Sequence, residues 1–214
     1  MVSKFGFGQK LESDIPGISG GLLPDVAFYN RWYGEHRWAF STIYSNSIGE
    51  GEMGVVPIQM ANLAATLANK GFYYTPHLVK GIGEDFSIRE AFTTKHETEI
   101  TPKYFDPVIE AMSAVVNLPG GTARQARLDS IEVCGKTGTV QNPDRPDHSV
   151  FICFAPRDNP KIAIAVYVEY SDYGGLWSAP ISSLLIEKYL TGKINDTEKE
   201  KRMLEAKFLT IYEK

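Results

Sequence analysis

The sequence predicts an α/β fold of the α+β kind, in which an antiparallel sheet is flanked by helices. Three apolar runs, at residues 131–140, 149–155 and 162–169, are strand-like. Short segments rich in Asn, Asp and Pro separate them, which is the composition of turns. An amphipathic pattern at 178–190 follows the third run and predicts a closing helix. Three meandering strands with a closing helix indicate an antiparallel sheet packed against helices.

The N-terminal third combines a loop-rich segment with the clearest helix of the chain. Residues 5–36 are rich in Gly, Pro and aromatic residues, so we expect mostly loop with short helical turns. The aromatic and charged stretch 30–38 is interpreted as a packed loop rather than a surface recognition loop. Pro57 in the first turn and Gly71 after the last turn bound a helix over 57–71. Its apolar positions predict burial on more than one side, and they are Ile58, Met60, Leu63, Ala64 and Leu67.

The middle of the chain predicts one further long helix. Residues 72–79 are expected to be extended, and the polar residues 82–100 to form an excursion. A helix is predicted over 104–116 and a short one over 122–128. The apolar face of the longer helix consists of Phe105, Val108, Ile109, Met112 and Val116.

The last strand and the closing helix differ in the burial that they predict. The run at 162–169 is almost wholly apolar, which predicts a strand covered on both faces. The helix at 178–190 is expected to bury one face only, formed by Ile181, Leu184, Leu185 and Tyr189.

The C-terminal tail predicts a charged helix over residues 196–214. Its apolar stripe consists of Met203, Leu204, Phe208 and Ile211. We therefore expect residues 1–192 to belong to one domain and residues 193–214 to form a charged helical tail.

Composition argues against several classes of function. The formal net charge of −4 comes with no basic stripe, so no nucleic acid is expected as a partner. No apolar run approaches the roughly 18 residues of a membrane span, and the first residues have no apolar signal-peptide core. The four histidines and two cysteines show no metal-ligand spacing, so neither a metal nor another cofactor is expected. Cys134 and Cys153 are expected to lie roughly opposite each other on adjacent strands as free thiols, because a bond there would be strained.

Residues 135–139, Gly-Lys-Thr-Gly-Thr, carry the chemistry of a carboxylate-binding strand. Gly138 has no side chain, so a ligand can lie beside its backbone. An extended backbone there can hydrogen-bond an incoming peptide as an added strand. The hydroxyls of Thr137 and Thr139 can donate to a carboxylate, and Lys136 supplies a positive charge. The segment predicts a surface for an extended peptide that ends in a carboxylate, although Lys-Thr-Gly alone also occurs by chance.

Lys-Thr-Gly is the third signature motif of serine β-lactamases and penicillin-binding proteins. Its surroundings resemble the class B penicillin-binding proteins of the elongation type, and the resemblance covers about residues 3–192. Four segments carry it in the family's order: Ser-Ile-Gly-Glu-Gly-Glu at 47–52 running into Pro-Ile-Gln-Met-Ala-Asn at 57–62; Gly-Phe at 71–72 with Thr-Pro-His-Leu-Val at 75–79; Gly-Gly-Thr-Ala at 120–123; and 134–141 followed by Asp-His-Ser at 147–149 and Phe-Ala-Pro at 154–156.

This resemblance implies a β-lactamase/transpeptidase-like fold in which the Lys-Thr-Gly strand forms one wall of the active cleft. The family's sheet has five antiparallel strands, of which about three are expected in this chain, so an unpaired edge is expected to favour self-association. Lys136 is implied to assist proton movement and to anchor the anion. Thr137 and Thr139 are implied to hold the carboxylate of the substrate or of penicillin, beside Gly138. The Thr139 N–H is implied to form one arm of the oxyanion hole.

Two further side chains lie near this motif in the sequence or in the predicted fold. Trp177, which follows Gly174-Gly175, is the best tryptophan candidate for lining a substrate cleft. His148, just after the turn that follows the motif strand, is interpreted as orienting that turn rather than transferring a proton.

The chain departs from the family's pattern in one respect that concerns catalysis. No serine is followed three residues later by lysine, and none is followed two residues later by Asn or Asp. The family's nucleophile lies in the first of these patterns, and covalent catalysis needs its nucleophile. Tyr44-Ser45-Asn46 is similar to a second-motif variant of some β-lactamases, but is interpreted as coincidental. This chain alone is therefore expected to be inactive.

For the whole protein, the resemblance implies a serine-type D,D-transpeptidase in cell-wall synthesis and cell shape. Its substrate is expected to be the D-Ala-D-Ala-ended stem peptide of peptidoglycan, its inhibitors β-lactam antibiotics, and its partner a membrane glycosyltransferase. It is expected on the periplasmic face of the bacterial inner membrane, held by an N-terminal helix absent from this chain. The alternatives left open are a β-lactamase or D,D-carboxypeptidase, a β-lactam-sensing domain, and an interaction module with a chance motif.

Overall fold

The structure is a computed structural model that describes residues 1–208. The chain divides into two compact units by packing. The first contains Met1–Gln59 and Tyr74–Thr98, and the second contains Met60–Tyr73 and Glu99–Lys214. The predicted division at residue 192 stays a prediction.

The first unit consists of long loops and short helices, as predicted for residues 5–36. Its elements are η1 (Val2–Phe5), α1 (Val26–Tyr33), α2 (Phe40–Ser47), α4 (Glu90–Thr93) and β2 (His96–Glu97). The Asp25 carboxylate accepts a hydrogen bond from Phe28 N at 2.7 Å and so caps α1. The helix α2 was not predicted, because it has no side-chain cap and buries no residue that would mark it in the sequence.

Buried Gln59 ties the loops of the first unit together. Its side-chain amide donates to the carbonyl oxygens of Gly6 at 2.9 Å and Gly20 at 2.8 Å. The predicted packing of residues 30–38 is only partly correct. Trp38 donates its indole N–H to Asn30 at 2.8 Å, whereas Trp32 is 69% exposed.

The helix α3 (Pro57–Ala68) confirms the helix expected from residue 57, and the second unit begins within it. Beyond α3, the helical elements of this unit are η2 (Pro102–Tyr104), α5 (Asp106–Asn117), η3 (Arg124–Ala126), α6 (Ser178–Thr191) and α7 (Thr197–Leu204). Of the extended segment expected at 72–79, only β1 (Phe72–Tyr73) is a strand. The predicted face of α5 is buried except at Val108, which is 43% exposed.

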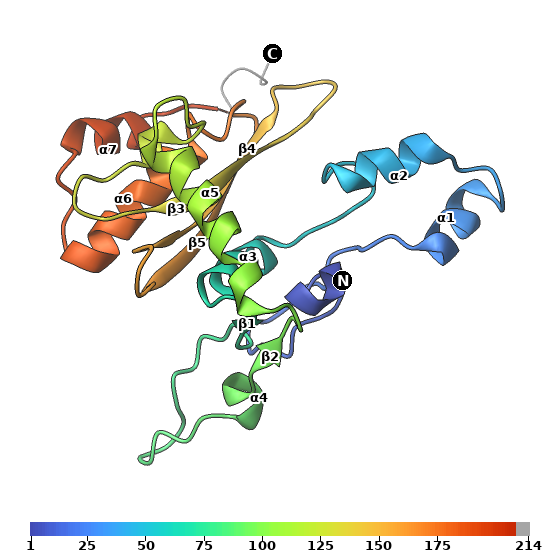
Figure 1. Ribbon diagram of the computed structural model, residues 1–214, viewed down its shortest axis with the longest axis horizontal. Coiled ribbons are helices and arrows are strands. Elements are labelled where there is room, and N and C mark those ends of the chain that lie inside the picture. Colours follow the sequence, from blue (N-terminus) through green and yellow to red (C-terminus); the bar gives the residue numbers. More distant parts are fainter. Residues whose placement is uncertain (209–214) are drawn as a thin grey trace. The chain divides into compact units, whose positions relative to one another are not determined.

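The second unit is built around the predicted antiparallel sheet. The strands β3 (Cys134–Val140), β4 (His148–Ala155) and β5 (Ile162–Val168) follow one another in the order β3-β4-β5. Within this unit α6 packs against β4 and β5, and α5 packs against β3 (Figure 1). Asp147 closes the first turn by accepting a hydrogen bond from Asn142 N at 3.0 Å. The strand positions therefore agree with the sequence prediction to within a few residues.

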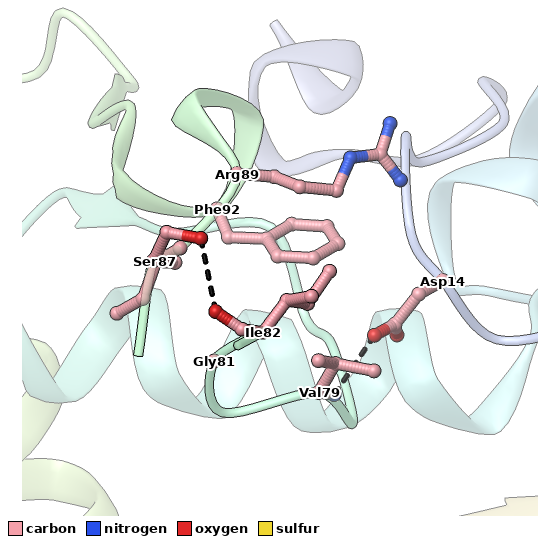
Figure 2. Close-up of a pocket in the computed structure, with 8 residues that line it drawn as sticks. Asp14, Val79, Gly81, Ile82, Ser87, Arg89 and Phe92 are labelled. Carbon is pink, nitrogen blue, oxygen red and sulfur yellow. Dashed lines mark hydrogen bonds between the residues drawn. The ribbon is translucent and has the colours of Figure 1, made fainter. Parts of the chain in front are cut away.

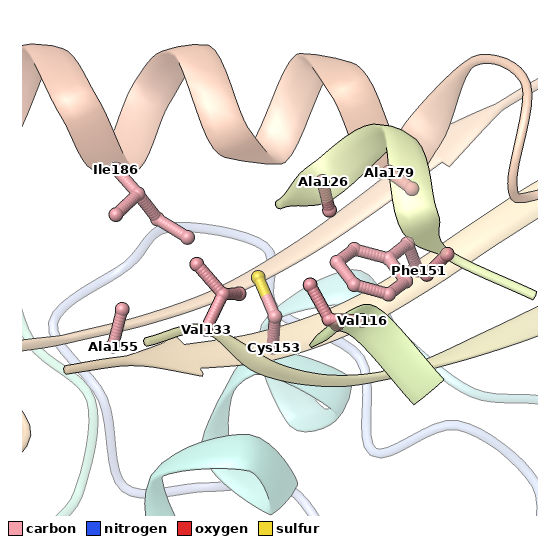
Figure 3. Close-up of a cluster of buried hydrophobic side chains, with 9 residues drawn as sticks. Val116, Ala126, Val133, Phe151, Cys153, Ala155, Ala179 and Ile186 are labelled. Carbon is pink, nitrogen blue, oxygen red and sulfur yellow. The ribbon is translucent and has the colours of Figure 1, made fainter. Parts of the chain in front are cut away.

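The core of this unit lies between β4 and the helices. Phe151, Cys153 and Ala155 point from β4 towards Ile186 and Ala179 of α6 (Figure 3). All five side chains are fully buried. Burying one large apolar side chain, such as that of Phe151, contributes about 1.5–3 kcal/mol, so this cluster stabilises the packing of α6 on β4.

One prediction of burial was wrong, and another was only partly correct. None of the residues of β5 is fully buried, because β5 is an outer strand of the sheet that residues 1–208 form. On the predicted face of α6, Leu184 is buried, whereas Leu185 and Tyr189 are 48% and 65% exposed. The helix instead buries Ser182 and Ser183, whose hydroxyls donate to backbone carbonyl oxygens of their own helix at 2.8 Å each. Small side chains that satisfy their own hydrogen bonds allow α6 to approach the sheet closely.

The two cysteines are free and buried, as predicted. Cys134 pairs with Phe154, and Cys153 pairs with Gly135, so the cysteines are one residue out of register. Because successive side chains alternate between the faces of a sheet, the two thiols lie on opposite faces. This offset, rather than strain, keeps them apart.

The C-terminal helix is shorter than predicted. It begins after Asp196, whose carboxylate accepts a hydrogen bond from Lys199 N at 2.9 Å, and ends at Leu204. Leu204 is 78% exposed, and Ile211 lies outside the described residues.

In the described part of the chain, no helix is long and apolar enough to span a bilayer.

Candidate functional site

The predicted binding segment lies on β3, an outer strand of the sheet. Lys136 is exposed, and Thr137, Gly138 and Thr139 are partly exposed. In residues 1–208, β3 pairs with β4 on one side only, so its other edge is open to an added strand.

The backbone of β3 presents alternate residues to this open edge. The Lys136 ammonium donates a hydrogen bond to the carbonyl oxygen of Thr137 at 2.6 Å. The carbonyl oxygen of Val133 likewise accepts a bond from the Asn117 side chain at 2.9 Å. Both carbonyl groups therefore point away from β4. In an antiparallel strand the N–H and C=O of one residue point to the same side, so the N–H of Thr139 also faces the open edge.

The side chains of the motif surround that edge from two sides. Thr137 and Thr139 lie on the face of the sheet that also carries Phe151, whereas Lys136 projects from the opposite face. The Lys136 side chain nevertheless reaches the edge, because its ammonium meets the Thr137 carbonyl oxygen. An extended ligand at this edge would meet two hydroxyls on one side and a cation on the other.

Two neighbouring segments, the one that contains Thr122 and the loop before α6, contact β3. The hydroxyl oxygens of Thr122 and Thr137 are 2.9 Å apart. The loop before α6 approaches β3 so closely that a Cβ on Gly174 would lie 2.7 Å from the Gly138 carbonyl oxygen. In the sequence, residue 122 was interpreted only as the start of a short helix and as part of the segment Gly-Gly-Thr-Ala, so its contact with Thr137 was missed.

The other two predicted side chains have different surroundings. Trp177 immediately precedes α6 as its N-cap residue and packs edge-to-face against Phe208, with ring centroids 4.7 Å apart. Its role as a substrate contact stays a prediction. His148 accepts a hydrogen bond from Tyr170 N at 3.1 Å and so joins the first residue of β4 to the segment after β5. This bond agrees with an orienting role for His148.

The first unit contains a small cavity of about 130 Å³ between a loop and α4 (Figure 2). Asp14 and Phe92 contribute to its lining. Both oxygens of the Asp14 carboxylate accept backbone hydrogen bonds, from Leu78 N and Val79 N at 2.8 Å each. These bonds, first that from Leu78, lower the pKa of Asp14. The carboxylate therefore fixes the loop, and we assign no chemistry to this cavity.

Comparisons with known proteins agree with the β3 motif. The family model described as penicillin binding protein transpeptidase domain matches residues 1–187. A peptidoglycan D,D-transpeptidase MrdA of Acinetobacter baumannii is 33% identical over 191 residues, which are 81% of this chain and 28% of that protein.

Solved structures agree as well. The structure of PBP2 of Pseudomonas aeruginosa in complex with WCK 5153 has a TM-score of 0.79 and 33% identity, and the match covers 91% of this chain and 43% of that one. The imipenem acyl-enzyme complex of penicillin-binding protein A of M. tuberculosis has a TM-score of 0.67 and 25% identity, covering 89% of this chain and 41% of that one. This chain thus spans less than half of the length of these relatives. It belongs to the penicillin-binding protein transpeptidase domain family, and within it to the class B, elongation-type members.

Proposed function

We propose that this chain forms the carboxylate-binding wall of a serine-type peptidoglycan D,D-transpeptidase, which cross-links stem peptides ending in D-Ala-D-Ala. The observation that carries the proposal is the open edge of β3, where Lys136, Thr137 and Thr139 converge. β-Lactam antibiotics also carry a carboxylate and would occupy the same wall.

The binding step follows from the geometry of this edge. An extended peptide can add to β3 as a strand by pairing with the outward N–H and C=O groups of Thr137 and Thr139. The peptide's terminal carboxylate accepts hydrogen bonds from the two threonine hydroxyls. The Lys136 ammonium exchanges the Thr137 carbonyl for the ligand's negative charge, and hydrogen bonds between charged groups are the stronger ones.

The same edge supplies part of the chemistry. When a nucleophile attacks the carbonyl carbon of the penultimate D-Ala residue, negative charge develops on the carbonyl oxygen. The Thr139 N–H, fixed in direction by the strand, donates to that oxygen as one arm of an oxyanion hole. Loss of one such donor typically lowers the rate by about 10²–10³. Lys136 assists proton movement beside the attacked bond.

This chain alone is proposed to bind without reacting. Its sequence has no Ser-x-x-Lys, and without the nucleophilic serine no acyl-enzyme can form.

The whole protein is proposed to lie on the periplasmic face of the inner membrane, held by an N-terminal helix, and to act with a membrane glycosyltransferase. Trp177 is proposed as an additional substrate contact.

Self-association of this chain is proposed through the sheet edge formed by β5. This strand is an apolar outer strand, and such edges pair with other chains. Sedimentation velocity should show a dimer that grows with concentration, and Ala165→Lys should reduce it because a charged edge resists pairing. A monomer at all concentrations would contradict this proposal.

A binding assay tests the proposed wall. Fluorescence anisotropy of a dansyl-labelled peptide ending in D-Ala-D-Ala reports its dissociation constant for the 214-residue chain. Lys136→Ala should weaken binding about tenfold or more, because a hydrogen bond to a charged group is lost. The matched control is Lys161→Ala, which removes an equal charge from an exposed lysine before β5. Equal affinities for the chain and for Lys136→Ala would exclude the proposed wall.

A second assay tests the proposed lack of acylation. Fluorescent penicillin is incubated with the chain, and the mixture is separated by denaturing electrophoresis. No labelled band is expected. A stable label on the chain would show a nucleophile that the sequence pattern does not reveal, and label that forms and is then released would favour a β-lactamase.

A further inference from the structure

Thr122 lies beside the binding edge without belonging to β3. It is exposed, in the segment between α5 and η3. Its hydroxyl oxygen is 2.9 Å from that of Thr137, although the two residues are 15 positions apart in the sequence. Either hydroxyl can be the donor in this hydrogen bond.

The backbone around Thr122 is held tightly on both sides. Ala123 N donates to the carbonyl oxygen of Val115, in the last turns of α5, at 3.1 Å. A Cβ on Gly121 would lie 2.2 Å from the same oxygen, so only glycine lets the chain fold back here. On the other side, a Cβ on Gly175 would lie 2.3 Å from the Thr122 carbonyl oxygen. Thr122 is therefore clamped between α5 and the loop before α6.

The number of hydrogens that each hydroxyl can donate decides which of the two threonines is the donor once a ligand is bound. A threonine hydroxyl has one hydrogen to donate and two lone pairs that accept. If Thr137 donates its hydrogen to a ligand carboxylate, its bond with Thr122 survives only with Thr122 as the donor. The chain of bonds then runs from Thr122 through Thr137 to the carboxylate, and each bond polarises the next.

We propose that Thr122 is a positioning residue, which turns the Thr137 hydroxyl so that its hydrogen points to the ligand carboxylate. This inference rests on the proposed carboxylate-binding function of β3. Without the Thr122 donor, the Thr137 hydroxyl can rotate and donate its hydrogen to an acceptor other than the ligand carboxylate. Loss of one neutral hydrogen bond of this kind weakens binding by about fivefold.

Two substitutions separate positioning from structural support. Thr122→Val keeps the shape of the side chain but removes the hydroxyl, and Thr122→Ser keeps the hydroxyl. Binding of the dansyl-labelled D-Ala-D-Ala peptide and of its C-terminal carboxamide is measured for the 214-residue chain and both variants, together with the thermal midpoint of each protein. The carboxamide peptide offers Thr137 a neutral acceptor in place of a charged one, so a loss that comes from the orientation of the Thr137 hydroxyl should be smaller for it, whereas general damage to the site should affect both peptides equally.

We expect Thr122→Val to bind the carboxylate peptide about fivefold more weakly and the carboxamide peptide with a smaller loss, and Thr122→Ser to bind both like the unmodified chain. Equal carboxylate binding by Thr122→Val would overturn the positioning role while leaving the wall intact. An equal loss for both peptides would also overturn it, because the effect would then be structural. Failure of the unmodified chain itself to bind would overturn the proposed function and, with it, this inference.

Discussion

The glycines on either side of Lys136 have opposite surroundings, and this difference makes a sharp prediction. A Cβ added to Gly138 would meet the Cβ of Val150 at 3.4 Å, an ordinary contact, and only one other atom within 4 Å. Alanine is therefore accommodated without moving the sheet. Because alanine also has fewer unfolded conformations than glycine, Gly138→Ala should leave the free energy of unfolding unchanged or raise it by up to about 1 kcal/mol.

Binding should respond in the opposite direction. In the proposed complex the ligand lies beside the Gly138 backbone, where a methyl group would push it away from β3. If two of the ligand's hydrogen bonds are lost, at about 1 kcal/mol each, the affinity falls by roughly thirtyfold. Gly138→Ala is thus expected to be a stable protein that binds poorly.

Gly135→Ala is the matched comparison on the same strand. Its Cβ would lie 2.2 Å from Cζ of Phe151, whose side chain is fully buried in the core. Overpacking of this kind costs about 1–3 kcal/mol, so this variant should unfold at lower urea concentration.

Urea unfolding followed by tryptophan fluorescence, and peptide anisotropy under native conditions, measure the two quantities separately. Unchanged affinity in Gly138→Ala would refute the reasoning about the ligand's path along β3. Unchanged stability in Gly135→Ala would refute the packing of β3 on β4.

Three further predictions concern buried or paired groups. The Ser149 hydroxyl is buried and has no hydrogen-bond partner among residues 1–208, so Ser149→Ala should raise the free energy of unfolding by about 1 kcal/mol in urea titrations, and a loss of stability would reveal an unseen partner. The hydrogen bond from Ser113 lowers the pKa of Glu132. The stability from this bond is complete above the ordinary pKa of a glutamate and is lost as the pH falls through the lowered value, so Tm should fall faster with acid in the unmodified chain than in Glu132→Gln, and parallel curves would contradict this. Burial raises the pKa values of Cys134 and Cys153 to about 12, so neither thiol should react with a disulfide reagent at pH 8 until urea unfolds the chain, and rapid native labelling would contradict this.

The sheet could be predicted from the sequence because its turns are marked by local chemistry. Asn-Pro-Asp and Asp-Asn-Pro segments end β3 and β4 regardless of what packs around them, and the strand positions followed. It was harder to predict which face of each helix or strand is buried. Burial of Ser182 on α6 depends on a hydrogen bond to its own helix, which an apolar pattern does not reveal. The partial exposure of β5 depends on its place in the strand order, which a single apolar run does not contain.

The candidate site likewise has a part that could be predicted from the sequence and a part that could not. The Lys-Thr-Gly motif is contiguous, so its residues could be named from the sequence, and an extended strand presents them together. The contact between Thr122 and Thr137 joins separate elements and exists only once α5 has packed against β3. Likewise, the packing of Trp177 on Phe208 depends on where the C-terminal segment returns.

The most direct test is a map of where the ligand binds. Amide signals of the ¹⁵N-labelled 214-residue chain are followed by NMR during titration with a peptide ending in D-Ala-D-Ala. We expect the largest shifts at Thr137 and Thr139, whose N–H groups face the open edge of β3, and only small shifts for the carboxamide peptide. Shifts that leave β3 unchanged and cluster instead around Asp14 and Phe92 would contradict the account.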